Sequence, residues 1–262
     1  MIFWRNFKDI ILSLLYPKNK IYIVSYPNSG RTWLKHMLWE IFEQLDVQAP
    51  NIEFTHDNSE IIIEDGTRID PKTIFKFTSR YKYLRAKVIF LCRDPRDIIT
   101  SNYHQVTKRA KNPFSFNNKS EFIQNEILGF KRIIHFFNLW ANNKSIPNKF
   151  LLVRYENLLS GINELENVLS FMNINADKQL ITKVYNASSA DKMRIKEKNN
   201  QIKGFTNFGK EVNQMKVRKA KKGSYLSELS IDDINFCNNE MSCLNKYFKY
   251  KYEVFLFIVF LF

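Results

Sequence analysis

The sequence predicts one α/β domain with a mostly parallel central sheet that helices cover on both faces. Three short apolar runs, residues 21–25, 87–92 and 149–154, have the length of buried strands. The first two lead through a polar loop into a helical pattern, and strands that alternate with helices form parallel sheets, which bind ligands at the carboxyl ends of their strands. The 262 residues contain no repeat and no Pro/Gly-rich boundary, so a single domain is expected.

Four helical stretches are expected around these strands. Apolar residues recur at helical spacing from Trp33 to Leu45, shortly after the first strand. A second helix is expected from Ile98, and two more over residues 121–143 and 161–172. This order of elements predicts helices on both faces of the sheet.

The two ends of the chain are expected to lie outside this domain. Residues 1–20 combine an amphipathic helical pattern with a turn, and Arg5, Lys8 and Asp9 argue against a secretory signal. A helix docked on the domain and a helix on a membrane surface both fit. Residues 251–262 are an apolar tail, and a helix over its wholly apolar part, residues 254–262, would reach ~14 Å, too short for a ~30 Å hydrocarbon core. A buried strand, a membrane-touching tail and a read-through artefact stay open for it.

The composition narrows the classes of function. With 45% hydrophobic and 15% aromatic residues the chain should fold, which excludes a disordered or collagen-like protein. The formal net charge of +14 predicts an anionic ligand or partner. Five of the seven residues 216–222 are basic, typical of a solvated face or of a patch for nucleic acid or anionic lipid. Cys92, Cys237 and Cys243 form no C-x-x-C pair, so no disulfide framework or metal site is expected, and a reducing, cytoplasmic location fits.

The loop after the first strand has the features of a phosphate site. Gly30 lets the backbone approach a ligand closely, and the free N–H groups at the start of the following helix attract anions. Thr32 adds a hydroxyl group. Arg31 stands where a P-loop has its lysine and the first P-loop glycine is missing, so the match to an ordinary P-loop is poor. A glycine that merely begins a helix is the second interpretation.

The loop after the second strand has an arginine and a hydroxyl suited to another phosphate. Arg93 follows the strand directly, and Ser101 comes eight residues later. In a second interpretation Arg93 pairs with Asp94 or Asp97, and Ser101 is a helix cap.

Four fragments, in order along the chain, resemble the soluble sulfotransferases that use 3′-phosphoadenosine 5′-phosphosulfate (PAPS). The fragments are residues 25–34, 88–97 with Ser101, 155–158 and 218–225. They are similar, in turn, to that family's 5′-phosphosulfate loop, its 3′-phosphate strand and helix, its Tyr-Glu-Asp-Leu segment and its Arg-Lys-Gly-x-x-Gly-Asp-Trp segment. The resemblance implies a P-loop-NTPase-like sulfotransferase fold over residues 21–250, PAPS as donor, 3′,5′-ADP (PAP) as product, and no metal.

The resemblance also implies which residues hold PAPS. The 5′-phosphosulfate would lie against Asn28, Ser29, Gly30, Arg31 and Thr32. The 3′-phosphate would be bound by Arg93, Ser101, Arg218 and Lys219. Trp33 would stack on adenine, in a pocket lined by Tyr155, Ser189 and Met193.

Asn28 departs from the family pattern, in which a loop lysine neutralises the leaving phosphate. Loss of one donor of this kind typically costs ~10²–10³ in rate. Arg31, Lys35 and Lys76 are the candidate replacements, and Arg31 is preferred as the catalytic cation because it lies in the loop.

Two further departures concern the nucleotide pocket. Ala220 stands in place of a glycine, so the backbone there must have a negative or mildly strained φ. Ala190 stands in place of an aromatic residue, which leaves Trp33 alone to stack on adenine.

Transfer to an alcohol needs a base, and histidine suits this role at neutral pH. The chain has four histidines, His36, His56, His104 and His135. His56 is preferred as the catalytic base because residues 54–57 are similar to the family's Thr-His segment, and Asp57 would add electrostatic support. His56 stands 37 residues before Arg93, a longer spacing than expected. A competing segment, residues 76–78, has a threonine in the histidine position.

The function expected from the sequence is sulfuryl transfer from PAPS to a hydroxyl or amine of a small-molecule, glycan or lipid acceptor. A nucleotide or sugar kinase of related fold is an alternative, weakened because no GK[S/T] loop with a Mg²⁺-holding carboxylate is found. A catalytically impaired PAPS/PAP-binding homologue is suggested by Asn28 and Ala220. A nucleic-acid-binding module is suggested by the basic run, although no nucleic-acid partner is expected of a sulfotransferase. Membrane-surface contact through the apolar ends stays open.

Overall fold

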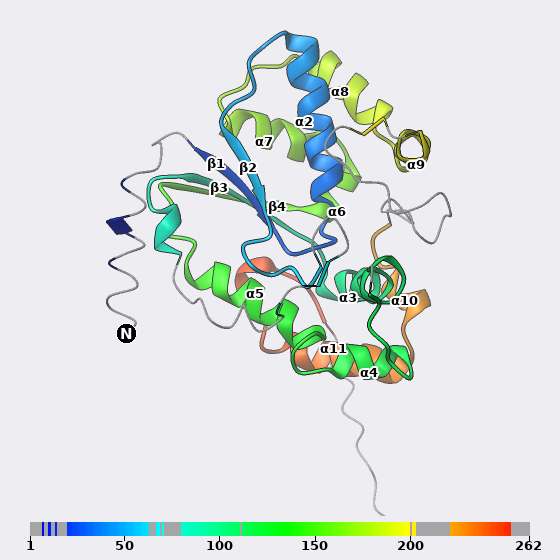
Figure 1. Ribbon diagram of the computed structural model, residues 1–262. Coiled ribbons are helices and arrows are strands. Elements are labelled where there is room, and N and C mark those ends of the chain that lie inside the picture. The colour runs from blue at the N-terminus through cyan, green and yellow to red at the C-terminus, as the bar shows by residue number, and fades with distance from the viewer. Residues whose placement is uncertain are drawn as a thin grey trace, which may run out of the picture.

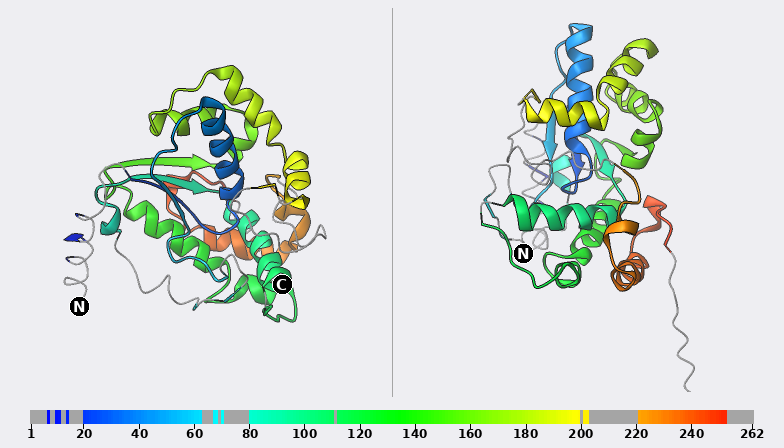
Figure 2. Two further views of the ribbon diagram at one scale, coloured as in Figure 1. Left: turned by 45° about the horizontal axis from the view of Figure 1, so that its top comes forward. Right: turned by 90° about the vertical axis from the view of Figure 1, so that its right-hand side faces the viewer.

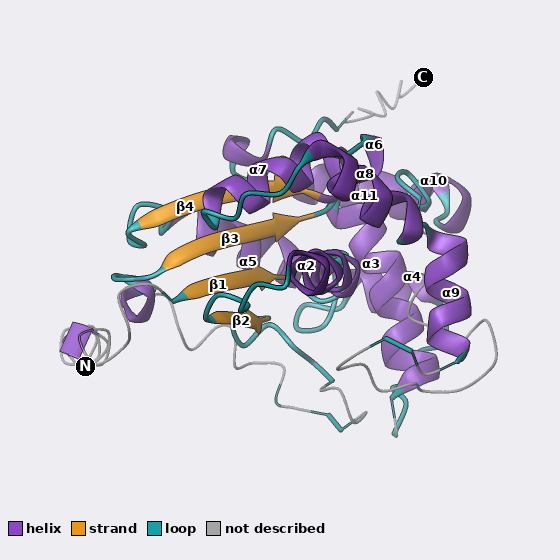
Figure 3. Cartoon of the chain, turned by 90° about the horizontal axis from the view of Figure 1, so that it is seen from above, coloured by secondary structure: helices purple, strands orange, loops and turns teal. Residues whose placement is uncertain are grey.

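Four parallel strands form the central sheet, in the order β2-β1-β3-β4. Their bounds are β1 (Ile21–Ser25), β2 (Ile52–Thr55), β3 (Lys87–Cys92) and β4 (Lys149–Arg154). All four strands point to the same end of the sheet (Figure 3), and the predicted α/β class is confirmed. The computed structural model describes residues 20–62, 80–110, 112–199, 201–202 and 221–252, with the isolated positions 7, 10, 11, 14, 67, 68 and 70.

The edge strand β2 is the one strand of this sheet that the sequence pattern does not predict. It has four residues and is only partly buried, whereas β1 is buried throughout. It pairs with β1 alone, from Ile21 opposite Ile52 to Val24 opposite Thr55. An edge strand of this kind lacks the continuous apolar run that identifies a central parallel strand.

The structure describes more helices than the sequence pattern predicts, because several are short and separated by tight turns. Before β4 they are α2 (Arg31–Leu45), α3 (Pro95–His104), α4 (Lys119–Gln124) and α5 (Phe130–Asn142), with the turns η2 (Tyr81–Tyr83) and η3 (Gln105–Arg109). After β4 they are α6 (Tyr155–Ser160), α7 (Asn163–Phe171), α8 (Lys178–Ala187), α9 (Ala190–Lys198), α10 (Tyr225–Glu228) and α11 (Ile231–Met241), with the turn η5 (Lys246–Phe248).

Helices cover both faces of the sheet (Figure 1 and Figure 2). Ile21 and Ile23 of β1 face a hydrophobic core that they share with α2, α7 and α8. Tyr22 and Val24 face the opposite core, which α5 and α11 close. Alternate residues enter different cores because successive Cβ atoms of a strand point to opposite faces of the sheet.

The single helix expected over residues 121–143 is in fact two helices, α4 and α5. The Leu128 amide donates to the Asn125 side chain at 2.9 Å, and the Gly129 amide donates to the Asn125 carbonyl at 2.9 Å. A Cβ atom at Gly129 would collide with the Ile123 carbonyl, so the turn requires glycine. The apolar pattern continues across the turn because both helices pack on the same core.

The expected end segments, residues 1–20 and 251–262, lie almost wholly outside the described residues. The division of the chain at residues 21 and 250 therefore stays a prediction. At described positions near the N-terminus, the side chains of Phe7, Ile11 and Leu14 are exposed. Of the helices that the structure describes, none combines the length and apolar character needed to cross a membrane.

Candidate functional site

A cavity of ≈ 360 Å³ opens at the carboxyl end of the sheet. Each strand contributes to its wall through the segment that follows it: Gly30 after β1, His56 after β2, Arg93 after β3 and Tyr155 after β4. Parallel sheets bind ligands at this edge. The predicted site residues that line the cavity are Asn28, Gly30, Arg31, Thr32, Trp33, His56, Arg93, Ser101, Tyr155, Ser189 and Met193.

Gly30 shapes the loop after β1. Its φ of 94° lies in the left-handed region, where it precedes the first turn of α2. Its backbone packs so closely on the Tyr155 ring that a Cβ atom would strike the ring carbons. The first N–H groups of a helix have no partner within the helix and lie at the positive end of its dipole. The loop therefore presents backbone donors suited to an anion.

Ser29 lies in the same loop and is fully buried. Its Oγ has no hydrogen-bond partner among the residues that the structure describes. A buried hydroxyl without a partner costs ~1–3 kcal/mol of free energy. Ser29 is the one predicted residue of this loop that is not among the described residues lining the cavity.

Asn28 connects the loop to the helix that follows β3. Its Nδ2 donates to Asn102 Oδ1 at 2.5 Å and to Gln105 Oε1 at 2.6 Å. Its backbone has a φ of 68°, a conformation that asparagine adopts more readily than most residues. Both amide hydrogens are thus engaged by protein atoms, and the side chain carries no charge for a ligand.

Three cations were considered as replacements for the loop lysine. Arg31 is the one of them found among the described residues that line the cavity. The Lys35 ammonium lies 5.4 Å from the centre of the Phe54 ring, and Lys35 is not among the described residues that line the cavity. Lys76 is outside the described residues. Burial raises the pKa of Glu60, and the nearby positive charge of Arg31 lowers it in part.

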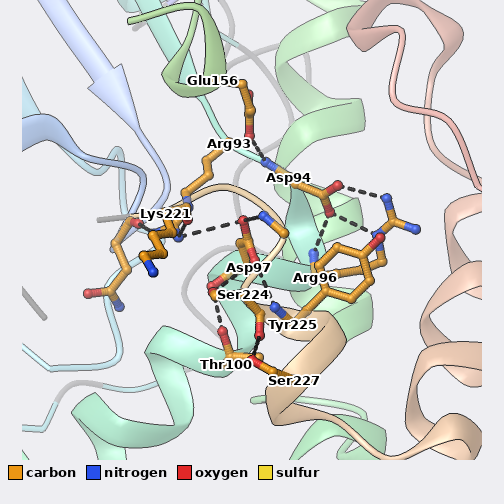
Figure 4. A network of polar contacts seen from close by, with 12 residues as sticks. Arg93, Asp94, Arg96, Asp97, Thr100, Glu156, Lys221, Ser224, Tyr225 and Ser227 are labelled. Carbon is orange, nitrogen blue, oxygen red and sulfur yellow. Dashed lines mark hydrogen bonds and ion pairs between the residues drawn. The ribbon is translucent and has the colours of Figure 1, made fainter. Parts of the chain in front are cut away.

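Arg93 lies in the cavity wall with only 8% of its surface exposed. Its Nη1 donates to the Asn28 carbonyl at 3.3 Å, and its Nη2 donates to the Lys221 carbonyl at 3.1 Å. The guanidinium carbon lies 4.7 Å from the centre of the Tyr155 ring. Asp97 Oδ2 lies 3.6 Å from Arg93 Nη2 (Figure 4). Arg93 therefore lines the cavity and also pairs with Asp97.

The second interpretation of this loop, in which Arg93 pairs with Asp94 or Asp97 and Ser101 caps the helix, holds only for the Arg93–Asp97 pair. Asp94 pairs with Arg96 rather than with Arg93, at 2.7 Å between Oδ2 and Nη2. Asp94 is also the N-cap of α3, since its side chain accepts a hydrogen bond from the Arg96 amide. Ser101 is inside α3 and faces the cavity, so it is not the helix cap.

The late basic segment of the predicted site cannot be compared with this geometry. Arg218, Lys219 and Ala220 lie outside the described residues. Their expected roles at the 3′-phosphate, and the expected backbone conformation of Ala220, stay predictions.

Aromatic rings gather around Trp33 in the cavity wall. The Trp33 Nε1 donates to the Ser188 carbonyl at 2.7 Å, which fixes the orientation of the indole. The rings of Tyr155 and Tyr185 each lie 5.9 Å from it, centre to centre. Tyr185 also lines the cavity, so its described wall holds a further ring besides Trp33 and Tyr155. The expectation that Trp33 alone stacks on adenine stays a prediction.

His56 follows the last residue of β2 and lies in the cavity wall. Its Nδ1 is 2.7 Å from the Ser25 carbonyl, an atom that only accepts hydrogen bonds. Nδ1 therefore carries the proton in the neutral ring, and Nε2 carries the lone pair. The Ser59 amide donates to the His56 carbonyl at 2.9 Å and closes the turn. This tautomer is the one that a base acting through Nε2 needs.

Asp57 is held by groups other than His56. It is almost fully buried, and its carboxylate lies 2.6 Å from Arg80 Nε and 2.8 Å from Lys82 Nζ. The Tyr83 hydroxyl donates to it at 2.7 Å. Burial and the Asp57 charge raise the pKa of Tyr83 well above its usual value. The Asp57 carboxylate is directed at these three groups. The electrostatic support of His56 that was expected from Asp57 therefore stays a prediction.

The other three histidines lie outside the cavity wall as described. His36 is buried beside Lys196, and burial followed by that positive charge lowers its pKa. The ring of His104 lies 3.5 Å from Glu228. Burial lowers the pKa of His135. Their positions agree with the preference for His56.

Several residues that line the cavity carried no signal in the sequence. Arg109 ends the π-helical turn η3, an irregularity that often occurs at functional sites. Tyr185 comes from α8, a helix that the apolar pattern did not predict. The remaining residues of this kind are Leu159, Asn186 and Glu228. Ser224 also lines the cavity and belongs to the fragment 218–225 that carries the resemblance. Among the described residues, no cluster of three or more His, Cys, Asp or Glu side chains suits a metal ion.

The fold and this site define the class of protein. A profile of the sulfotransferase domain matches residues 18–242, so the chain belongs to the sulfotransferase domain family. The chain is 26% identical over 216 residues to sulfotransferase 1E1 of Bos taurus, which covers 74% of this chain and 71% of the relative. It is 23% identical over 236 residues to sulfotransferase 1E1 of Mus musculus, with 82% and 78% covered.

Solved structures of sulfotransferase-like proteins have the same fold. Mouse sulfotransferase SULT7A1 complexed with PAP has a TM-score of 0.57 at 16% identity, over 87% of this chain and 84% of that one. Retinol dehydratase in complex with androsterone and PAP has a TM-score of 0.61 at 15% identity, over 90% and 84%. The predicted family and its fold are thereby confirmed.

Proposed function

We propose that this protein is an enzyme that transfers a sulfuryl group from PAPS to a hydroxyl or amine of an acceptor, releasing 3′,5′-ADP. The observation that carries the proposal is the shared cavity. Residues from the loops after all four strands line it, in a chain of the sulfotransferase family. Solved proteins of the same fold are described as complexes with PAP.

The donor groups of the cavity suit a nucleotide with two phosphorylated positions. At the loop after β1, the backbone amides from Gly30 onward and the Thr32 hydroxyl would hold the 5′-phosphosulfate. The Ser29 hydroxyl is fully buried and is not among the described residues that line the cavity, so its expected role there stays a prediction. Arg93 and Ser101 would bind the 3′-phosphate, since a guanidinium fork matches phosphate oxygens. Arg218 and Lys219 stay predicted partners of the same group.

Trp33, Tyr155, Ser189 and Met193 would form the adenine pocket. Trp33 is fixed by its hydrogen bond to the Ser188 carbonyl, and Met193 is fully buried in the cavity wall. Tyr185 adds a further ring beside Trp33. An adenine ring would gain from flat apolar contacts of this kind.

His56 would be the catalytic base. The Ser25 carbonyl holds the proton on Nδ1, so Nε2 accepts the proton of the acceptor hydroxyl. When bound, PAPS would supply the sulfuryl group and a leaving phosphate whose negative charge increases during transfer. Arg31 would stabilise that charge, because it is the one of the three candidate cations found in the cavity wall as described.

A catalytically impaired PAP-binding homologue is the second candidate. It is favoured by one observation: both amide hydrogens of Asn28, the residue in place of the loop lysine, are bound to Asn102 and Gln105. In this case the nucleotide would bind and no sulfuryl group would be transferred.

The test begins with nucleotide binding by isothermal titration calorimetry. We expect 3′,5′-ADP to bind and ATP to compete poorly, and Arg93→Gln to weaken the binding of 3′,5′-ADP. Lys149→Gln, at an exposed residue that begins β4, is the matched control and should bind as the wild type does. Binding of ATP with Mg²⁺ in preference to 3′,5′-ADP would support a kinase instead.

Turnover then separates the two candidates. Radiolabelled PAPS is incubated with a panel of phenols, steroid and retinoid alcohols, sugars and amines, and labelled products are counted. Product with any acceptor supports the enzyme. Tight binding of 3′,5′-ADP with no product across the panel favours the impaired homologue.

We also infer a small hydroxyl-bearing acceptor and a cytoplasmic location. The support for the acceptor is that structural relatives are described with androsterone and retinol bound. Fractionation of cells that express the full chain tests the location. Recovery with sedimented membranes, rather than in the supernatant, would favour contact of the apolar ends with a lipid surface.

A further inference from the structure

Asp97 is a fully buried acid on α3 that holds two separate parts of the chain together. Its Oδ2 accepts a hydrogen bond from the Gly223 amide at 2.8 Å. Its Oδ1 accepts from the Ser224 hydroxyl and from the Tyr225 amide, each at 3.0 Å (Figure 4). Oδ2 also lies 3.6 Å from Nη2 of Arg93. One carboxylate therefore faces three hydrogen-bond donors and a guanidinium group.

The groups that Asp97 holds belong to the cavity, although Asp97 itself lies behind its wall. Arg93 and Ser224 both line the cavity, and they come from segments 131 residues apart in the sequence. Arg93 makes a second link to the same segment through the Lys221 carbonyl at 3.1 Å. Gly223 turns the chain around the carboxylate with a φ of 72°.

We propose that Asp97 is a positioning residue for the 3′-phosphate site. It fixes the Arg93 guanidinium and residues 221–225 against each other, so that this wall of the cavity is formed before a nucleotide binds. The inference rests on the proposed function, since Arg93 is the residue assigned there to the 3′-phosphate.

The chemistry of the contacts explains why an acid is needed. A carboxylate only accepts hydrogen bonds, and both of its oxygens face donors. An amide in its place turns one oxygen into an NH₂ group that faces either the Gly223 amide or the Tyr225 amide, donor against donor. The 3.6 Å separation from Arg93 is longer than the 2.7 Å of the neighbouring Asp94–Arg96 pair. Asp97 thus adds to the Asn28 and Lys221 carbonyls that orient Arg93, without a close ion pair that would compete with a ligand.

The experiment compares two nucleotides that differ only in the 3′-phosphate, 3′,5′-ADP and 5′-AMP, by calorimetric titration. For Asp97→Asn we expect the affinity for 3′,5′-ADP to fall about tenfold or more, as for loss of one hydrogen bond to a charged group. The affinity for 5′-AMP should change less than about threefold. In turnover, the KM for PAPS should rise by a larger factor than kcat falls.

Two further variants keep the test decisive. Ser224→Ala removes one donor at a partly exposed position and should lower the 3′,5′-ADP to 5′-AMP affinity ratio by a smaller factor. Asp94→Asn is the matched control: it disturbs the N-cap of the same helix and an Arg96 ion pair, so Tm should fall while the affinity ratio stays that of the wild type.

The outcomes separate the inference from the proposed function. If the wild type binds neither nucleotide, the proposed function fails. If the wild type prefers 3′,5′-ADP and Asp97→Asn weakens both nucleotides by the same factor, or neither, Asp97 has only a structural role and the inference is wrong. If Asp97→Asn does not fold, an unchanged affinity ratio in Ser224→Ala overturns the inference.

Discussion

The loops that follow β1 and β2 both reach the cavity, and they are fixed by different physical means. The first loop is fixed by backbone geometry: Gly30 adopts a left-handed φ and packs on the Tyr155 ring. The second loop is fixed by charge, because Asp57 is buried against Arg80 and Lys82 directly after His56. The first loop therefore requires a residue without a side chain, Gly30, whereas the second loop requires a charged side chain, Asp57, with a buried partner, Arg80.

The difference explains what each loop can offer a ligand. The first loop presents backbone donors at the start of α2, which suits an anion. The second loop uses its charged groups in its own structure and presents the His56 imidazole at the cavity instead. In the proposed function, the anion site and the base would therefore lie after neighbouring strands.

The largest effect is expected from Gly30→Ala. The new Cβ would collide with the Tyr155 ring and would also hold a strained φ of 94°, so the loop must move. A fall in kcat/KM of more than about 10³-fold is expected from strain and misplacement together. Steady-state kinetics and 3′,5′-ADP titration measure it.

Gly161→Ala is the control for this prediction. Gly161 also has a positive φ, 151°, but no atom of the described residues lies within 4 Å of a Cβ placed there. Its substitution should lower Tm and leave kcat/KM close to the wild-type value. Equal losses of activity in both variants would show that the Tyr155 contact does not shape the first loop.

The second prediction concerns the base. His56→Ala should lower kcat by ~10²–10⁴, the usual range for general base catalysis, because no imidazole would accept the proton. The affinity for 3′,5′-ADP should stay within about threefold, since the residues proposed to hold the nucleotide belong to other segments. His36→Ala, which alters a buried histidine outside the cavity wall as described, is the control. A kcat near the wild-type value for His56→Ala would remove His56 from this role.

The same contrast separates what the sequence predicts well from what it does not. The residues predicted for the first loop are adjacent in the chain, and position 30 requires glycine. A short sequence motif is therefore enough to identify this loop. The second loop depends on Asp57 and Tyr83, which lie 26 residues apart. The short edge strand β2, which places His56, has no apolar run to reveal it. Long-range burial of charge leaves no local signature.

Arg109 and Tyr185 show the same limit at the cavity wall. Arg109 lies there because η3 winds as a π-helical turn, which moves later side chains around the helix axis. Tyr185 lies there because α8 packs beside α2. Neither position follows from spacing within one element, whereas the positions of Arg93 and Ser101 follow from a strand, a loop and one helix.

The third prediction tests the charge of the first loop. Arg31→Gln should lower kcat by ~10²–10³, the cost of losing one donor that stabilises developing charge. Lys35→Gln removes a cation four residues later whose ammonium lies over the Phe54 ring, and its kcat should stay near that of the wild type. If Lys35→Gln causes the larger loss, Arg31 is not the replacement for the lysine.

The smallest change in turnover is expected from Asp57→Asn, which tests whether charge fixes the second loop. The substitution keeps the shape of the side chain and removes the buried negative charge that faces Arg80, a residue with only 2% of its side chain exposed. The free energy of unfolding should fall by about 3 kcal/mol, as for a broken buried pair. The kcat should fall about tenfold, within the ~10² that a misplaced group can cost. Urea denaturation and steady-state kinetics measure the two effects.

An exposed pair provides the comparison for this last variant. Asp191 pairs with Arg194 on α9, and 85% of the Asp191 side chain is exposed. Asp191→Asn should lower the free energy of unfolding by less than ~1 kcal/mol, because water screens such a pair. If Asp57→Asn is no more destabilising than Asp191→Asn and keeps full kcat, buried charge does not hold His56 in place. The two loops would then be fixed by the same means, namely the hydrogen bonds of their backbones.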